Sequence, residues 1–248
     1  MRVVIHGASG RMGRVLCRML EEGYEGMSLA AQVSPSCAEG GAPNCYSSLA
    51  NFTGEADCVV DFSIHSATKT LLDYCVSRRL PVVIATTGHT AEEMDMIRAA
   101  AEEIPVFFSA NMSVGVALVA DLARRAAAMF PAADIEIIEK HHNRKLDVPS
   151  GTALLLADSI RKARTDAEYV IGRHENGRRK AGEIGIHAVR LGNEVGTHEI
   201  IIATGNETVT IKHEAEDRSL FAGGALTAAA FLQGKAPGYY TMQDILAK

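Results

Sequence analysis

The sequence predicts an α/β protein: a Rossmann-type, doubly wound parallel sheet followed by a smaller α+β domain with a mixed or antiparallel sheet. Two observations support this prediction. Over the first half of the chain, short β-branched runs alternate with helical patterns, which is typical of a parallel sheet with helices on both faces. From about residue 112 the rhythm changes to a long Ala-rich helical stretch and then to alternating strands.

The elements of the first half follow one another at short intervals. The expected strands lie at residues 3–5, 29–33, 58–60, 82–84 and 106–108. The expected helices lie at residues 11–22, 66–77 and 90–102. Thr90, with Glu93 three residues later, has the pattern of a capping box and marks the start of the third helix.

The second half has longer elements. Helices are expected at residues 114–129 and 152–163, and strands at residues 135–139, 186–191, 197–203 and 208–213. Gly205 and Asn206 make a good two-residue hairpin turn between the last two strands. Residues 169–183, rich in Gly, Arg and Lys, are expected to form a mobile surface loop. A final helix should begin near residue 218 or 219 and run to about residue 232.

We therefore expect two domains. Residues 1–111 and 220–248 should form a dinucleotide-binding domain, with the last helix returning from about Leu220 to cover it. Residues 112–219 should form the smaller α+β domain.

The composition excludes several functional classes. A net charge of −5 over 248 residues does not suggest nucleic-acid affinity, and the absence of Trp argues against a stacking platform for single strands. No apolar run approaches the roughly 20 residues that span a membrane. The N-terminus enters a strand pattern without a signal-peptide layout. The five cysteines include no Cys-x-x-Cys pair, so we expect free thiols in a reducing cytoplasm.

A glycine-rich turn directly follows the first expected strand. Residues 6–13 read His-Gly-Ala-Ser-Gly-Arg-Met-Gly, a G-x-x-G-x-x-G variant of the dinucleotide fingerprint. Gly7 permits the tight turn, Gly10 lets the backbone approach a pyrophosphate, and Gly13 lets helix and strand pack closely. The anion would lie on the N–H groups that open the first helix. A merely glycine-rich turn is the alternative, but the strand–loop–helix context favours nucleotide binding.

The end of the second expected strand bears on the choice of cofactor. An NAD site usually places Asp or Glu there to bind the ribose hydroxyls. Residues 32–36 read Gln-Val-Ser-Pro-Ser, with neither a carboxylate to repel a 2′-phosphate nor an arginine to clamp it. The sequence therefore leans towards NADPH, with NADH also accepted.

Two further loops lie at the carboxyl ends of expected strands, where a doubly wound sheet gathers its ligand. They are Ala-Thr-Thr-Gly at residues 85–88 and Ser-Ala-Asn-Met at residues 109–112. Small and hydroxyl residues there would let a nicotinamide ring lie close to the backbone, although ordinary turn and capping chemistry is the alternative for each loop. Asp-Phe-Ser at residues 61–63 is similarly placed.

The segment from residue 139 to residue 153 carries the densest chemistry: Glu-Lys-His-His-Asn-Arg-Lys-Leu-Asp-Val-Pro-Ser-Gly-Thr-Ala. His141 and His142 can hold or pass protons near neutral pH, and Lys145 adds a positive charge. Gly151 and Thr152 open an expected helix, where free N–H groups and the dipole favour an anion. This combination suits a small acidic molecule that must also receive a proton.

Two other interpretations of this loop are a metal site and a purely structural segment. A metal site is disfavoured, because adjacent histidines in a strand diverge and the His-Glu-x-x-His pattern is absent, so no metal is expected. A purely structural reading would make these residues solvated loop side chains, but the clustering beside a helix start argues against it. The remaining histidines look isolated and are expected to be structural: His65, His89, His174, His187, His198 and His213.

These motifs closely resemble the 4-hydroxy-tetrahydrodipicolinate reductase (dihydrodipicolinate reductase) family of bacteria and plants. The family pattern Glu-x-His-His-x-x-Lys-x-Asp-x-Pro-Ser-Gly-Thr-Ala stands complete at residues 139–153. The other matching segments follow in the family's order, at residues 7–13, 61–63, 86–88, 111–115 and 185–190. The chain departs from many members in having Ala85 for Gly, Ser63 for Thr and no acidic residue near Val33.

The resemblance implies a role for each matched residue. His141 and Lys145 would be catalytic, and His142, Gly151 and Thr152 would hold substrate carboxylates. The cofactor would lie against Gly7, Ala8, Ser9, Gly10, Arg11, Met12, Ala85, Thr86, Thr87, Ser109, Ala110, Asn111 and Met112. Family members are usually homotetramers assembled through the C-terminal sheet, so residues 112–219 would bind substrate and form the oligomer.

The expected activity is the NAD(P)H-dependent reduction of a small heterocyclic dicarboxylate, 4-hydroxy-tetrahydrodipicolinate, with loss of water, in lysine and diaminopimelate biosynthesis. Domain closure, with hinges near Asn111 and Leu220, would bring hydride and acceptor together. Three other functions remain open: another two-domain dehydrogenase, acting on a sugar or a semialdehyde; a nucleotide-sensing regulator without turnover; and a metal-dependent hydrolase. The loop at residues 139–153 argues against the regulator.

Overall fold

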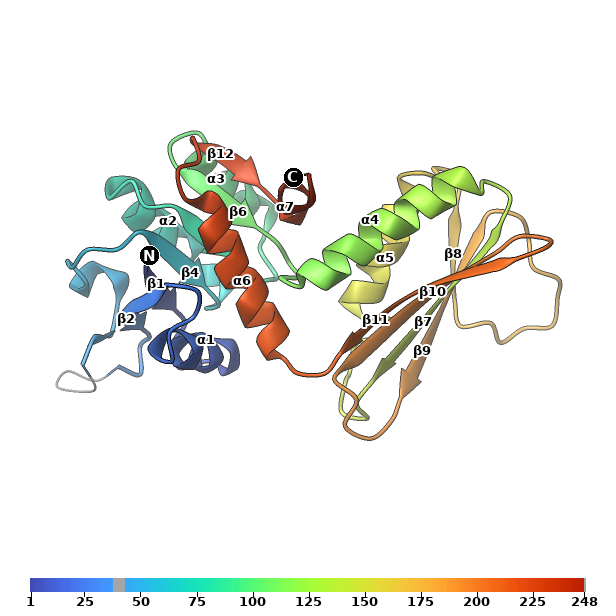
Figure 1. The fold of residues 1–248 in the computed structure, drawn as a ribbon, viewed down its shortest axis with the longest axis horizontal. Helices are drawn as coiled ribbons and strands as arrows, with labels where there is room; N and C mark the ends of the chain where they lie inside the picture. Colours follow the sequence, from blue (N-terminus) through green and yellow to red (C-terminus); the bar gives the residue numbers. More distant parts are fainter. Residues whose placement is uncertain (38–42, 248) are drawn as a thin grey trace. The chain divides into compact units, whose positions relative to one another are not determined.

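The structure, a computed structural model, describes residues 1–37 and 43–247 and divides into two compact units (Figure 1). Residues 1–113 and 219–248 form the first unit, and residues 114–218 form the second.

The first unit is built on a seven-stranded, wholly parallel sheet in the order β12-β6-β5-β4-β1-β2-β3. Its strands are β1 (Arg2–His6), β2 (Ser28–Val33), β3 (Cys45–Tyr46), β4 (Cys58–Asp61), β5 (Val82–Ile84), β6 (Pro105–Phe108) and β12 (Gly238–Tyr240). The strand order reverses between β1 and β4, which is the topological switch point where doubly wound sheets bind ligands. The predicted Rossmann-type sheet is confirmed.

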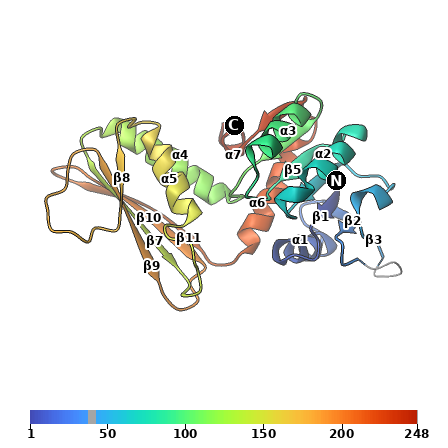
Figure 2. The same ribbon diagram turned by 180° about the vertical axis from the view of Figure 1, so that it is seen from behind.

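Helices cover both faces of this sheet, as a parallel sheet with two buried faces requires. One face is covered by α1 (Arg11–Glu21) and α6 (Ser219–Leu232), the other by α2 (Thr68–Ser77) and α3 (Ala91–Ala101) (Figures 1 and 2). Thr90 and Glu93 form the predicted capping box at the start of α3. Short elements complete the unit: η1 (Leu49–Asn51), η2 (His65–Ala67) and α7 (Met242–Leu246).

The second unit packs two helices on one face of a five-stranded mixed sheet in the order β11-β10-β7-β9-β8. Its elements are α4 (Val114–Met129), β7 (Asp134–His141), α5 (Gly151–Arg161), β8 (Glu168–Ile171), β9 (Glu183–Arg190), β10 (Gly196–Ala203) and β11 (Thr208–Ala215). Strands β7, β9 and β8 run parallel, while β10 is antiparallel to both β7 and β11. The hairpin turn at Gly205 and Asn206 is confirmed by the 2.9 Å bond from Thr204 N to Glu207 O.

Side chains along β7 alternate between the face packed against the helices and the opposite face of the sheet. Ile135 and Ile137 are fully buried against the helices, together with Ile184, Ile186, Ile200 and Ile202 of the neighbouring strands. Glu139 and His141 continue the same inward-facing series, so the strand carries its core face directly into a pair of polar side chains.

Two expectations about local structure were wrong. Residues 169–183 are not wholly a loop, because β8 occupies residues 168–171 and pairs with β9. Nor are all five cysteines free: Cys37 and Cys45 form a disulfide, while Cys17, Cys58 and Cys75 are buried free thiols. Pairing of β2 with β3 places Gln32 beside Cys45, and the N–H of Cys37 donates to Ser34 O in the turn after β2. The Cys37 and Cys45 Cα atoms lie 5.5 Å apart.

Among the helices in the described part of the chain, none combines the length and the apolar character needed to cross a membrane.

The core of the second unit can be tested with a matched pair of leucines. Leu156 on α5 is fully buried, whereas Leu146 is 95 % exposed. We expect Leu156→Ala to lower the free energy of unfolding by about 2–5 kcal/mol, because it removes buried apolar surface and leaves a cavity. Leu146→Ala should change it by less than about 0.5 kcal/mol. Urea unfolding followed by circular dichroism measures both, and equal losses would contradict this packing.

Candidate active site

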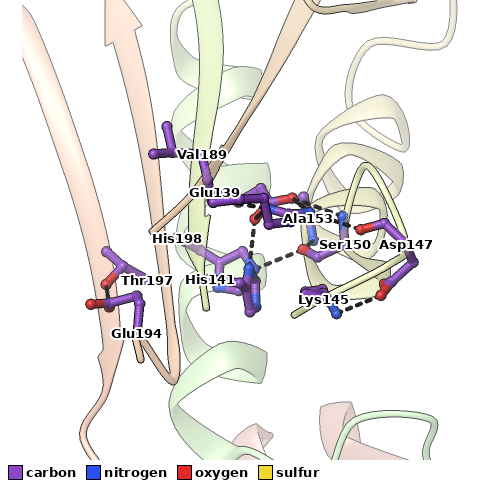
Figure 3. Close-up of polar contacts among 11 residues, drawn as sticks. Glu139, His141, Lys145, Asp147, Ser150, Ala153, Val189, Glu194, Thr197 and His198 are labelled. Carbon is purple, nitrogen blue, oxygen red and sulfur yellow. Dashed lines mark hydrogen bonds and ion pairs between the residues drawn. The ribbon is translucent and has the colours of Figure 1, made fainter. Parts of the chain in front are cut away.

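The carboxylate of Glu139 is completely buried near the end of β7 and joins three elements of the second unit (Figure 3). Its Oε2 accepts a 2.6 Å hydrogen bond from His141 Nδ1, and its Oε1 accepts one of 3.1 Å from the backbone N–H of Ser150. Arg190 on β9 donates to both oxygens at 2.8 Å. Burial alone would raise the pKa of Glu139, but the hydrogen bonds from His141 and Arg190 hold it at about 2. Glu139 is therefore an anion at neutral pH.

The imidazole of His141 is held from two further sides. The ring of His198, on β10, lies edge-to-face with it at a centroid distance of 5.1 Å. A Cβ at Gly196 would lie 3.0 Å from His141 Nε2, so the absence of a side chain there leaves room for the ring. His141 is only 8 % exposed, which limits its access to water.

His198 connects this cluster to the start of α5. Ser150, the N-cap residue, accepts a hydrogen bond from the backbone N–H of Ala153 at 3.1 Å, and its Oγ lies 3.0 Å from His198 Nε2. Burial lowers the pKa of His198 from 6.5 to about 3. His198 is therefore neutral at physiological pH and adds no positive charge beside His141.

A cation and a helix start already contact one carboxylate of the chain. Lys145 Nζ pairs with Asp147 at 2.9 Å, and this contact lowers the pKa of Asp147, with a smaller contribution from the backbone N–H of Gly151 (Figure 3). A Cβ at Gly151 would meet no atom within 4 Å, so packing within the chain does not require glycine there. The same groups are suited to bind the carboxylate of a ligand.

His142 adds a neutral imidazole in basic surroundings. Its Nδ1 is buried and has no hydrogen-bond partner among the residues that the structure describes. Burial lowers the pKa of His142, and the nearby positive charges of Arg144, Arg218 and Lys145 lower it further. This face of the second unit therefore combines positive potential with an unused polar nitrogen.

In the first unit, the turn after β1 is shaped for close approach of an anion. Gly7 has a φ of +85°, and a Cβ there would lie 2.6 Å from the carbonyl oxygen of Phe62. A Cβ at Gly13 would lie 2.2 Å from Gly7 O. Gly10 is the N-cap of α1, which has no side-chain cap and no acidic residue in its first turn. The first N–H groups of the helix fit a pyrophosphate, with buried Ala8 and exposed Ser9 and Arg11 around the turn.

Serine hydroxyls gather where β2 ends. Ser9 Oγ lies 2.5 Å from Ser34 Oγ, which in turn lies 3.1 Å from Ser36 Oγ. The described residues that follow β2, residues 34–37, include no carboxylate. A hollow of about 840 Å³ has His6 and Pro35 in its wall, and the rest of its lining comes mainly from residues 47–53 and from α2. These features suit a phosphorylated or unphosphorylated ribose.

A second buried carboxylate, Asp61, ties together the strand ends of the first unit. Its oxygens lie 2.8 Å from His6 Nδ1 and accept bonds of 2.6 Å from both Ser63 Oγ and Thr86 Oγ1. Ala85 and Thr86 are buried at the end of β5, while Thr87 is exposed.

The loop after β6 is held by its own side chains. Ser109 Oγ donates to Asn111 O at 2.6 Å, and Asn111 Oδ1 accepts from Ser113 N at 2.9 Å. Met112 is buried, and Ala110 is exposed.

The predicted residues therefore fall into two groups. His141, His142, Lys145, Gly151 and Thr152 lie in the second unit, and the predicted cofactor residues lie in the first, at the ends of β1, β5 and β6.

Sequence reasoning assigned no role to several residues of the second-unit cluster. Glu139 and Arg190 lie inside motifs that the sequence analysis recognised without giving them a function, and Arg218 was named only as a possible start of the last helix. His198 was set aside as isolated, which is wrong, because it contacts both His141 and Ser150. The alternation of β10 could have shown that His198 shares the inward face with Ile200 and Ile202, but its partner strand was unknown.

The doubly wound sheet and the glycine-rich turn after β1 define the class of dinucleotide-binding proteins, and the comparisons place the chain among its oxidoreductases. Residues 1–112 match the family model described as "Dihydrodipicolinate reductase, N-terminus", and residues 115–246 match "Dihydrodipicolinate reductase, C-terminus". The chain belongs to the dihydrodipicolinate reductase family.

Individual relatives agree with this assignment. The chain is 46 % identical over 249 residues to the 4-hydroxy-tetrahydrodipicolinate reductase of Caldanaerobacter subterraneus subsp. tengcongensis, covering 100 % of this chain and 98 % of that protein. It is 40 % identical to the enzyme of the same name from Clostridium tetani, covering 99 % and 96 %. Among solved structures, the dipicolinate-bound dihydrodipicolinate reductase from Paenisporosarcina sp. TG-14 superposes with a TM-score of 0.83 at 25 % identity, over 97 % of each chain.

The neutral state of His198 has a measurable consequence for stability. The unfolded chain takes up a proton at this residue near pH 6.5, whereas the folded protein does so only near pH 3. The free energy of unfolding should therefore fall as the pH drops below about 6.5, by about 1 kcal/mol per pH unit from this group. In urea unfolding between pH 7.5 and 5, His198→Gln should reduce that decline, and the exposed control His174→Gln should not. A His198→Gln decline as steep as that of the wild type would contradict the assignment.

Proposed function

We propose that this protein is a 4-hydroxy-tetrahydrodipicolinate reductase. It converts (2S,4S)-4-hydroxy-2,3,4,5-tetrahydrodipicolinate, NAD(P)H and a proton into tetrahydrodipicolinate, NAD(P)+ and water, in lysine and diaminopimelate biosynthesis. Family membership over nearly the whole chain supports this reaction. The single structural observation that carries it is the cluster of His141, Lys145 and the α5 start within one unit.

The substrate carboxylates bind the positive groups of the second unit. The N–H groups of Gly151 and Thr152 donate to one carboxylate, assisted by the helix dipole. His142 and Lys145 bind the carboxylates from the loop that precedes α5. Asp147, which now pairs with Lys145, gives way to the incoming anion.

His141 supplies or relays the proton that completes the reduction. Its limited exposure and its hydrogen bond to Glu139 keep the imidazole in one orientation. Lys145 stabilises negative charge on the substrate and assists the proton transfer. We assign no metal to the reaction.

The first unit holds the nicotinamide cofactor. Residues 7–12 bind the pyrophosphate; Ala85, Thr86 and Thr87, with Ser109 to Met112, line the nicotinamide end. When bound, NAD(P)H supplies a hydride to ring carbon C4 of the substrate. NADPH is favoured and NADH is accepted, because Ser34 and Ser36 can donate to a 2′-phosphate that no carboxylate in residues 34–37 would repel.

The second sheet also provides a surface for assembly. The face of the second sheet opposite α4 and α5 carries half-buried Ile138 and Ile201, and we assign this sheet to the contacts of a homotetramer. The division of labour follows the two units, with the first for the dinucleotide and the second for substrate and assembly. The protein acts in the cytoplasm, where its cofactor and amino-acid precursors are made.

The two catalytic residues can be tested by turnover. His141→Ala and Lys145→Ala should each lower kcat by about a hundredfold or more, because each removes a group that moves a proton or stabilises charge. Loss of nicotinamide absorbance, with freshly generated substrate, measures the rate. The exposed residues His174 and Lys162 provide controls of the same type, and their Ala variants should retain full rates. Unchanged turnover in both test variants would remove the assigned roles.

Cofactor preference can be tested at Ser36, which is exposed beside the ribose end. Ser36→Asp adds a negative charge near the 2′-phosphate, so KM for NADPH should rise about tenfold while KM for NADH changes little. Ser36→Asn is the matched control, because Asn has nearly the same size as Asp but carries no charge. A uniform effect on both cofactors would argue against this placement of the 2′-phosphate.

A further inference from the structure

The contacts around Glu139 extend the proposed reaction to a residue that meets neither substrate nor cofactor. We propose that Glu139 is a positioning residue: its two oxygens fix the proton-bearing nitrogen of His141 and hold that ring against the carboxylate-binding start of α5. The inference rests on the proposed function, since it takes His141 as the group that handles the proton.

The contact with Glu139 determines the tautomer of His141. Glu139 is ionised, and a carboxylate without a proton can only accept hydrogen bonds. The 2.6 Å contact therefore places a proton on Nδ1 whenever His141 is neutral, and leaves Nε2 as the nitrogen that gains and loses a proton. In this way Glu139 selects which nitrogen can serve the substrate.

Glu139 also holds His141 in position. The same carboxylate accepts from the N–H of Ser150, the residue immediately before Gly151 and Thr152. The carboxylate thus connects His141, the proposed proton donor, to Ser150 at the start of α5, and eight residues, 142–149, separate the two in the sequence. A change at Glu139 should therefore disturb both turnover and substrate binding.

Arg190 holds the carboxylate of Glu139 from the side of β9. Its two nitrogens bind the two oxygens of Glu139 at 2.8 Å each, and one nitrogen also donates to Asp147 O at 2.7 Å. The fork holds the carboxylate in one plane and balances its charge. Arg190 therefore opposes the effect of Glu139 on the protonated form of His141.

Charged and titratable groups lie around His141 on four segments. On its own strand lies Glu139, on β9 Arg190, on β10 the neutral His198, and in the following loop His142 and Lys145. Glu139 contributes negative charge to this set, and Arg190 and Lys145 contribute positive charge.

The same strand supplies a matched control. Glu136 also pairs with a histidine, His187 Nε2 at 2.7 Å, and lies within 3.6 Å of Arg173, but it faces the opposite side of the sheet. It combines the same kinds of partner without contact to His141 or α5.

The kinetic test compares three variants over a range of pH, using nicotinamide absorbance with saturating NADPH. Glu139→Gln should lower kcat about ten- to a hundredfold and raise KM for the substrate, by analogy with other residues that orient an active group. Its alkaline limb of activity, where the donor loses its proton, should move about one unit to lower pH. Arg190→Gln should move the limb the other way, by roughly half a unit. Glu136→Gln should leave it in place.

Opposite shifts distinguish positioning from general damage, because a loosened structure lowers activity without moving the limb in two directions. If the alkaline limbs of Glu139→Gln and Arg190→Gln both stay at the wild-type pH, or both move in the same direction, the inference is overturned.

A second measurement uses the wild-type protein, so it does not depend on the folding of any variant. Ring 15N chemical shifts of His141, recorded above the pH of its titration, should show a protonated Nδ1 and an unprotonated Nε2. A protonated Nε2 would overturn the inference even if His141→Ala is inactive. If instead His141→Ala keeps full activity while the Nδ1 proton is found, the proposed function of His141 fails and the structural link to Glu139 stands.

Discussion

The second unit depends on how one buried negative charge is satisfied. An ionised carboxylate removed from water is costly unless donors surround it, and Glu139 is surrounded by His141, Ser150 and Arg190. These partners come from the end of β7, the start of α5 and the end of β9. The charge can be buried only when all three segments converge, so the chemistry of the cluster and the local fold are established together.

In the first unit, the buried side chain of Asp61 likewise joins several segments. This carboxylate lies at the end of β4 and contacts His6, Ser63 and Thr86, which belong to three neighbouring strand ends. In both units a buried carboxylate accepts hydrogen bonds from residues at or next to those assigned to ligand binding: Glu139 from Ser150, and Asp61 from Thr86. Rigid support of this kind is what a reaction between two bound molecules requires, because small displacements of reacting groups reduce the rate strongly.

Much of this architecture could be predicted from the sequence because it depends on local patterns. The alternation of β-branched runs with helices predicted the parallel sheet, and the glycine spacing after β1 predicted the tight turn, where a Cβ at Gly7 or Gly13 would clash with backbone atoms. Residues 139–153 predicted a cluster because their spacing in the chain is short.

Features that depend on partners distant in the sequence could not be predicted in this way. His198 joins the cluster because β10 pairs with β7, and no local pattern specifies that pairing. The disulfide between Cys37 and Cys45 depends on the register of β2 and β3. β3 and β12 are two and three residues long, too short for a periodic pattern, and β8 lies beside a polar, glycine-rich stretch.

The start of α5, with His142 and Lys145, is the proposed binding site for the carboxylates of a planar heterocyclic diacid. Titration of the 15N-labelled protein with dipicolinate tests it directly. The largest changes in chemical shift should occur at the backbone N–H groups of Gly151 and Thr152 and at the His142 ring. Saturable binding that leaves these resonances in place and moves others would contradict the claim.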